Sequence, residues 1–336
     1  MGSDVRVGVV GATGALGSEI LKVLDKAPWR PDEVVALARA STSRSHVAYG
    51  DEQLVVDDVE HEVLEELELL ILALPASEAR VYGEAAASAG VPVVDASGVF
   101  VRDGDVPLVV PWVNPEALAD VPRGVVSLPT APAALLASVL GPLRRAGLVG
   151  RCAATVLMPA SSAGRDGIDE LSRQVVALFN SASPPRKVFP AGLAFDLIPM
   201  EGPSSDASGW TRHEQRVSSE ARGLAGWAGP VVVTEVVVPV FSGVSATIEL
   251  HLERPVPLEL VRQVLVDGGV RMAEEEGPRA QPRPRKVEGH PFAHVGRIRQ
   301  AEDGSIHLWA TVDNLRAMAT VAVATGAALL GDRIER

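Results

Sequence analysis

A glycine-rich turn near the start of the chain constrains the fold more than any other feature. Gly11, Gly14 and Gly17 form a G-x-x-G-x-x-G run between an apolar strand expected at 5–10 and a helix expected at 15–26. Glycine allows a tight turn and close approach of a pyrophosphate, and the helix N-terminus offers unpaired N–H groups and a positive dipole end. The run predicts a dinucleotide-binding turn with contacts from Gly11, Thr13, Gly14, Ala15, Leu16 and Gly17. The alternative is a tight turn that binds no ligand.

The first hundred residues alternate between strand and helix. Apolar runs at 34–38, 69–73 and 91–94 are expected strands, and 77–89 is an expected helix with Ser77 as its N-cap. The run at 69–73 is continuous, which is typical of a central parallel strand buried on both faces. This rhythm predicts an α/β fold built on a Rossmann-type doubly wound parallel sheet.

The residues after the second expected strand bear on the choice of cofactor. A site that prefers NAD usually has an acidic residue there for the ribose hydroxyls, whereas this chain has Arg39 and Ser41. The planar guanidinium of arginine suits a 2′-phosphate, so NADP is favoured and NAD is the less favoured cofactor. The alternative is that Arg39 is an ordinary surface arginine.

The pattern changes after Pro129. Helices are expected at about 133–146, at about 168–179 and from about 313, and strands at 153–158, 231–241, 245–252 and 306–312. Residues 181–227 show little periodicity, and 278–286 is a Pro-rich basic segment typical of a solvated surface loop. We predict a first domain at 1–126, completed by a C-terminal helix at 313–336, and an inserted second α/β domain at 127–312.

Charge and cysteine content exclude several classes of partner. The 336 residues carry a formal net charge of −12, which repels nucleic acid and anionic membranes. The single cysteine, Cys152, cannot form an internal disulfide, and the start of the chain lacks the pattern of a signal peptide. We therefore expect a cytoplasmic protein. The seven histidines show no metal-ligand spacing, so no metal site is expected.

Several segments, in order along almost the whole chain, resemble the aspartate-semialdehyde dehydrogenase family. They are the glycine turn at 7–17, D-V-P-L-V-V-P-W-V-N at 105–114, the S-S-A-G and E-L stretch at 161–171, G-L-A-F-D-L-I-P at 192–199, V-G-R-I-R at 295–299 and D-N-L-R at 313–316. The resemblance implies that the inserted domain packs a mixed sheet against its twin in a homodimer. It also implies that Ser162, Gly164 and Asn314 contribute to the cofactor site.

The resemblance implies a reaction that passes through a cysteine thiolate at the start of a helix. A histidine moves the proton, and the acyl-enzyme exchanges hydride with NADP and acyl with phosphate. In this chain the cysteine position holds Ala131 and the histidine position holds Val244. Three further family positions, for a substrate arginine, a glutamine and a phosphate-binding arginine, hold Val237, Met158 and Val101, with Arg102 next to the last. We therefore predict that this chain carries none of the family's usual catalytic residues.

A few polar residues resemble remnants of the family's substrate site. Glu214, Arg216 and Glu220 fall on a family segment that helps to hold substrate, and Arg102 completes this set. The alternative for the three residues at 214–220 is an exposed helix face. Cys152 is expected to be a small buried residue, because it lies in a β segment and does not open a helix.

Three hypotheses about function follow. The first is a family member that binds NADP but lacks the family's chemistry and acts through binding, regulation or assembly. The second is an active NADP-dependent aspartate-semialdehyde dehydrogenase of amino-acid biosynthesis. The third is an oxidoreductase that acts on a different, more apolar substrate. We rank them first, third and second, and the small-molecule ligand stays unknown.

Overall fold

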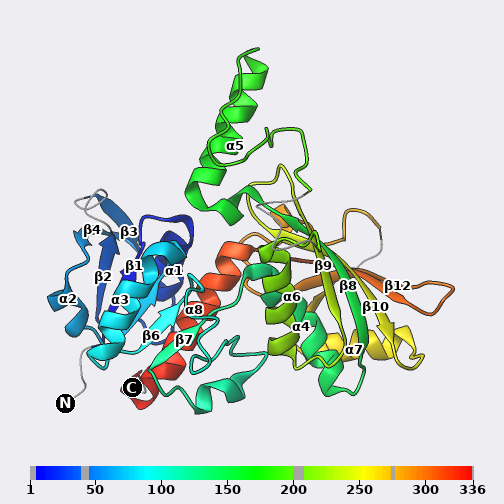
Figure 1. The fold of residues 1–336 in the computed structure, drawn as a ribbon, viewed down its shortest axis with the longest axis horizontal. Coiled ribbons are helices and arrows are strands. Elements are labelled where there is room, and N and C mark those ends of the chain that lie inside the picture. The colour runs from blue at the N-terminus through cyan, green and yellow to red at the C-terminus, as the bar shows by residue number, and fades with distance from the viewer. Residues whose placement is uncertain (1–4, 39–44, 200–207, 274–276, 335–336) are drawn as a thin grey trace. The chain divides into compact units, whose positions relative to one another are not determined.

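The computed structural model describes residues 5–38, 45–199, 208–273 and 277–334. The chain divides into two compact units (Figure 1). Unit 1 comprises Met1–Pro129 and Met318–Arg336, and unit 2 comprises Thr130–Ala317. Each unit has its own sheet and core, so they are described separately.

Unit 1 is built on a seven-stranded sheet with the order β3-β4-β2-β1-β5-β6-β7. Its strands are β1 (Arg6–Val10), β2 (Glu33–Ala38), β3 (His46–Tyr49), β4 (Glu52–Asp58), β5 (Leu69–Leu72), β6 (Val93–Asp95) and β7 (Val125–Ser127). The pairs from β4 to β7 are parallel, and the edge strand β3 runs antiparallel to its neighbour. The predicted Rossmann-type sheet is therefore confirmed.

Helices cover both faces of this sheet. They are α1 (Ala15–Asp25), α2 (His61–Glu65), α3 (Ala76–Ser88) and, from Met318 onward, α8 (Asn314–Leu330). Leu70 and Leu72 of β5 belong to a core cluster with residues of α2 and α3, whereas a Cβ at Gly326 of α8 would lie 2.6 Å from Leu69 Cδ2. Because neighbouring side chains of a strand point to opposite faces, α3 and α8 lie on opposite sides. The central strand β5 is fully buried, as its sequence predicted.

The start of α3 differs from the prediction. The helix begins at Ala76 with Pro75 at the N-cap, and Ser77 lies inside its first turn. Pro75 has a φ of −57°, which suits the entry into a helix, and a proline has no N–H to leave unpaired there. The predicted Ser77 cap is therefore wrong.

Unit 2 is built on a six-stranded mixed sheet with the order β11-β12-β13-β10-β8-β9. Its strands are β8 (Gly150–Met158), β9 (Val231–Val237), β10 (Val244–Leu252), β11 (Arg271–Met272), β12 (His294–Gln300) and β13 (Ile306–Val312). The pairs β8–β9 and β11–β12 are parallel and the other three pairs are antiparallel. The observed β13 has the bounds expected from the sequence.

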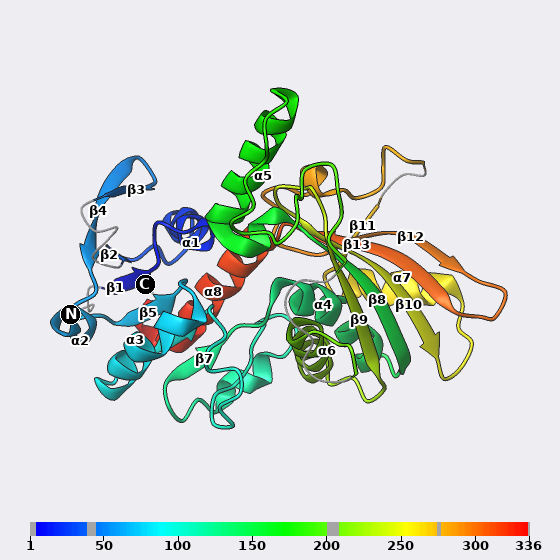
Figure 2. The same cartoon turned by 45° about the horizontal axis from the view of Figure 1, so that its top comes forward.

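The main helices of unit 2 are α4 (Ala131–Arg145), α5 (Gly164–Phe179), α6 (Arg212–Ala225) and α7 (Leu258–Asp267). Figures 1 and 2 show α4 and α6 against one face of the sheet, and α6 contacts β9 directly. Short 3-10 helices lie at Ala160–Ala163 and Pro284–Lys286 in unit 2. Two more lie in unit 1, at Pro115–Ala119 and Gly331–Ile334.

Helix α6 corrects the expectation that 181–227 is irregular. A capping box supports its start, because the Thr211 hydroxyl accepts from the Glu214 N–H while the Glu214 carboxylate accepts from the Thr211 N–H. Gly226, in the left-handed conformation with φ of 58°, ends it. The Pro-rich segment at 278–286 also departs from a purely solvated loop, because Ala280 and Pro282 are buried.

Candidate functional site

The glycine turn of unit 1 joins β1 to α1 and is fixed by backbone contacts. Gly11 has φ of +89°, and the N–H groups of Gly11 and Ala12 donate to Leu37 O at 2.9 and 3.3 Å. A Cβ at Gly17 would lie 2.1 Å from Gly11 O, so only glycine allows the helix to start this close to the turn. Helix α1 begins at Ala15 without a side-chain cap from the described residues, which leaves the helix end suited to an anion.

Arg39 and Ser41, the two residues on which the prediction of NADP depends, lie outside the described residues. Thr13, Ala15 and Leu16 lie in or directly after the glycine turn, as expected. Arg102 also belongs to unit 1, where it is exposed in a turn. The other expected site residues belong to unit 2.

Ala131, which the sequence resemblance assigns to the family's cysteine position, is the first residue of α4. Thr130 is the N-cap, and its hydroxyl accepts from the Ala133 N–H at 3.4 Å. The helix start is the place where a dipole would lower a thiol pKa, but the side chain here is a methyl group. This position therefore offers no nucleophile.

Glu220 and Arg216 lie beside the start of α4. Glu220 Oε2 accepts from the Thr130 N–H at 2.7 Å and from the Thr130 hydroxyl at 2.9 Å. Glu220 Oε1 accepts from Arg216 Nε at 2.5 Å. Both oxygens of this buried carboxylate are thus engaged with the protein itself, and they tie α6 to α4.

Glu214 is equally engaged within unit 2. Its Oε2 accepts from the Thr211 N–H and hydroxyl, and its Oε1 accepts from the Glu235 N–H at 3.1 Å. Glu214 is 7% exposed and Glu220 is 4% exposed. The alternative of an exposed helix face is therefore wrong for these two glutamates, because their carboxylates satisfy backbone donors inside the unit.

Met158, Val237 and Val244 lie together at one end of the unit 2 sheet. Met158 pairs with Val237 across β8 and β9, and Val244 precedes Ser245, which pairs with Leu157. The register places all three on the face that α4 and α6 cover, and each is at most 5% exposed. A carboxylate or phosphate brought here would lose water without gaining a charged partner from these side chains.

Asn314, at the start of α8, connects two segments of unit 2. Its Oδ1 accepts from the Gly243 N–H at 2.8 Å, and its Nδ2 donates to Ser161 Oγ at 3.0 Å. Ser162 donates to Pro159 O at 2.6 Å, and Gly164 has φ of +72° with open space at its Cβ position. The family resemblance implies that Ser162, Gly164 and Asn314 contribute to one site, which stays a prediction, and it did not indicate the contacts of Ser161 and Gly243 with Asn314.

Cys152 is the third residue of β8 and is fully buried. Burial, followed by the negative charge of Glu249, raises the pKa of the Cys152 thiol to about 12. A thiol that is neutral and shielded from solvent is a poor nucleophile. Cys152 is therefore not suited to act as a nucleophile.

Two buried carboxylates were not found from the sequence. Glu235 Oε2 lies 2.6 Å from His213 Nδ1, a contact between β9 and α6. Glu170 accepts from the N–H groups of Lys187, Val188 and Phe189. Burial by itself would raise the pKa of Glu170, but these three bonds and the charge of Arg173 hold the pKa below its ordinary value.

The residues that the structure describes contain no group of three or more His, Cys, Asp or Glu side chains placed to hold a metal ion. No helix formed by these residues is long and apolar enough to cross a membrane.

Comparison with known proteins identifies the family. Residues 6–121 match the model "Semialdehyde dehydrogenase, NAD binding domain" and residues 140–317 match "Semialdehyde dehydrogenase, dimerisation domain". The chain is 30% identical to an aspartate-semialdehyde dehydrogenase of Rickettsia bellii, with 94% of each chain covered. It is 32% identical to a USG-1 protein homolog of Pseudomonas aeruginosa, covering 99% of this chain and 98% of the relative.

The structure agrees with these matches. An aspartate semialdehyde dehydrogenase II of Vibrio cholerae, solved in complex with ASA, superposes with a TM-score of 0.91 at 29% identity, covering 98% of each chain. The family models together match most of the chain, in the order and at the places of the two units. The chain belongs to the aspartate-semialdehyde dehydrogenase family.

Proposed function

We propose that this chain is a family member that binds NADP but does not carry out the family's thioester chemistry. The observation that carries the proposal is Ala131 as the first residue of α4, together with the buried Val244 in place of a histidine. Covalent catalysis on a carbonyl needs a lone pair to attack and a base to take the proton. Neither side chain supplies either one.

The residues of the glycine turn fit a dinucleotide. The three glycines of the turn from Gly11 to Gly17 have no side chains, so a ligand could approach the backbone closely there. The N-terminal end of α1 would bind the pyrophosphate. Ser162, Gly164 and Asn314 are the further proposed contacts, and NADP is preferred to NAD because of Arg39 and Ser41. When bound, this cofactor would supply hydride transfer.

Other groups near the start of α4 do not replace the thiolate. The Thr130 hydroxyl already donates to Glu220 Oε2 at 2.9 Å. A carboxylate is a weak base for an alcohol, since their pKa values differ by roughly ten units. Loss of a nucleophile typically lowers a rate by on the order of 10⁴ or more, so the usual activity should be negligible.

A second candidate function is an oxidoreductase with a more apolar substrate. Burial of Met158, Val237 and Val244 at one end of the unit 2 sheet favours it over an active aspartate-semialdehyde dehydrogenase. An aspartyl substrate carries a carboxylate, which the family holds with an arginine at the position of Val237. The hypothesis of an active aspartate-semialdehyde dehydrogenase is supported by the names of several relatives.

We also propose that the chain is located in the cytoplasm, as its sequence predicts, and that it assembles as a homodimer through unit 2. One face of its sheet is covered by helices, whereas Thr155, Thr234 and Thr247 on the other face are exposed in the single chain. Residues 140–317 match a dimerisation domain. We propose that two copies pack through this open face, with an unknown small molecule as the ligand.

Calorimetric titration with NADP, NADPH and NAD, followed by a turnover assay, tests the proposal. We expect binding of NADP that is tighter than binding of NAD, and no phosphate-dependent oxidation of aspartate semialdehyde. Rapid turnover that survives Cys152→Ser would contradict the account of the site. Failure to bind any of the three dinucleotides would refute the cofactor proposal.

A further inference from the structure

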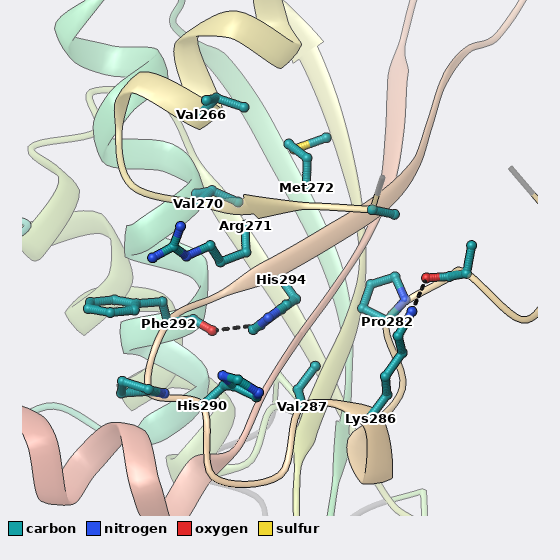
Figure 3. Close-up of a pocket in the computed structure, with 13 residues that line it drawn as sticks. Val266, Val270, Arg271, Met272, Pro282, Lys286, Val287, His290, Phe292 and His294 are labelled. Atoms are coloured by element: carbon teal, nitrogen blue, oxygen red, sulfur yellow. Dashed lines mark hydrogen bonds between the residues drawn. The ribbon is translucent and has the colours of Figure 1, made fainter. Parts of the chain in front are cut away.

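Unit 2 contains a cavity of about 800 Å³ that shares no lining residue with the candidate site described above. It lies between the end of α7, strand β11 and the segment 280–294 (Figure 3). A volume of this size falls in the range of ordinary small-molecule sites, which is roughly 300–1,000 Å³. The cavity is therefore large enough for a metabolite-sized ligand.

Among the described residues that line this cavity, the side chains with charged or titratable groups are cationic or become cationic on protonation. They are Arg271 from β11, Lys286 from the Pro284–Lys286 turn, and His290 and His294 from the following segment. None of the described residues that line the cavity is acidic. In a chain with a net charge of −12, such a group of basic side chains is unexpected on composition alone.

Each of these side chains lines the cavity, and each is positioned by a contact of its own. The Arg271 guanidinium lies 5.8 Å from the centre of the Phe292 ring, and the rings of His290 and His294 are 5.6 Å apart. The Lys286 ammonium donates to Ala280 O at 2.9 Å, which uses one of its three donors. Figure 3 shows His294 between Arg271 and Lys286, with His290 below it.

The other described residues that line the cavity are apolar. Val266 and Val270 line one side and Met272, Pro282 and Val287 line others. A ligand that fits must therefore combine an anionic group with an apolar body, because either part alone would leave half of the wall without a partner. We propose that this cavity binds a small organic anion through Arg271, Lys286 and the two histidines.

The histidines make the binding dependent on pH. His294 Nδ1 lies 2.9 Å from Phe292 O, and since a carbonyl only accepts, Nδ1 carries the proton. Burial, together with the positive charges of His290, Arg271 and Lys286, holds the pKa of His294 below its ordinary value, against the bond to Phe292 O, which raises it. An anion in the cavity favours the protonated imidazole, so binding takes up a proton and strengthens as the pH falls from neutral through the lowered pKa of His294.

The test uses 1-anilinonaphthalene-8-sulfonate on the full chain, followed by fluorescence. Its uncharged counterpart, N-phenyl-1-naphthylamine, has the same apolar skeleton without the sulfonate. Arg271→Gln and Lys286→Gln should each weaken binding of the sulfonate by about three- to tenfold and leave the uncharged probe unchanged. Arg285→Gln is the matched control, because Arg285 adjoins Lys286 but does not line the cavity.

The outcomes separate the possibilities. Equal affinity of the sulfonate for the wild type and both cavity variants would overturn the proposal, as would equal binding of the two probes. His294→Gln should flatten the pH dependence, and a steep dependence in that variant would also count against it. A triple variant, with Glu274→Gln, Glu275→Gln and Glu276→Gln, tests whether carboxylates of the chain itself compete for these cations. If the wild type binds neither probe and the triple variant binds the sulfonate, the proposal of an external ligand is refuted.

Discussion

The glycine turn of unit 1 and the sheet end of unit 2 carry different kinds of constraint. At the turn the backbone itself forms the feature, and a Cβ at Gly17 would lie 2.1 Å from Gly11 O. At the sheet end the strands and their register are intact, but the side chains are Met158, Val237 and Val244. A site formed by the backbone is kept as long as the fold is kept. A site formed by side chains can change its chemistry through substitutions that leave the fold unchanged. The following experiments test this contrast.

The largest effect is expected from placing a thiol at the start of α4. In Ala131→Cys, the new thiol would lie at a helix N-terminus, where the dipole favours the thiolate, while Cys152 stays buried with a raised pKa. We expect the introduced thiol to react with iodoacetamide at least about a hundredfold faster than Cys152. The wild type, with Cys152 alone, is the control. Equal labelling of the two chains would show that the position is not accessible to chemistry.

Gly17→Ala should break the nucleotide turn. The added methyl group must displace Gly11 O and the start of α1, and overpacking of this kind costs about 1–3 kcal/mol or more. We expect a lower free energy of unfolding in urea and loss of NADP binding. Gly104→Ala is the matched control in unit 1, because nothing lies within 4 Å of its Cβ position. Equal effects of the two substitutions would contradict the claim that the turn is fixed by close backbone packing.

Glu220→Gln tests whether this carboxylate is structural. It accepts from the Thr130 N–H, the Thr130 hydroxyl and Arg216, and bonds of this kind to a charged group contribute about 1.5–3 kcal/mol. We expect a loss of about 2 kcal/mol of stability in urea unfolding, with NADP affinity unchanged. Glu259→Gln, at an exposed position in the first turn of α7, should be neutral. A stable variant with altered ligand binding would instead favour a role in substrate recognition.

The smallest effect concerns pH and Glu170. Its folded-state pKa is lowered, so its contribution is present above the unfolded-state pKa and is lost as pH falls through the folded-state pKa. The loss should therefore occur below about pH 4.3, the ordinary value for glutamate. Glu170→Gln should reduce the acid dependence of the free energy of unfolding in that range. If the free energy of unfolding of the variant depends on pH below about 4.3 as that of the wild type does, Glu170 does not contribute to the acid dependence.

Elements whose apolar residues match their burial could be predicted from the sequence. Strand β13 has buried residues at both ends and in its middle, and its bounds follow from the apolar run at 306–312. The sequence offered a helix face at 214–220 only as an alternative, and the bounds of α6 escaped prediction. Two of its buried residues, Glu214 and Glu220, are charged and bond to partners far along the chain. Strand β12 has exposed residues and a register shift between Gly296 and Arg299, which obscure its alternation.

The candidate site divides in the same way. The glycine turn could be located because it lies within one contiguous segment of sequence. The assignment of Ala131 and Val244 to the family's catalytic positions also rests on contiguous segments, and it stays a prediction. The contact of Glu220 with Thr130, 90 residues apart, and of His213 with Glu235 could not, because no local pattern reports a pairing made by the fold. Long-range polar contacts of this kind require coordinates.

Intact-mass spectrometry tests the central claim most directly. The chain is incubated with aspartate semialdehyde and NADP without phosphate, which would let an acyl-enzyme accumulate if one formed. We predict that the mass of the protein stays unchanged, since Ala131 offers no atom to acylate and Cys152 is buried. An acyl adduct mapped to Thr130, to Cys152 or to any residue of unit 2 would contradict this account.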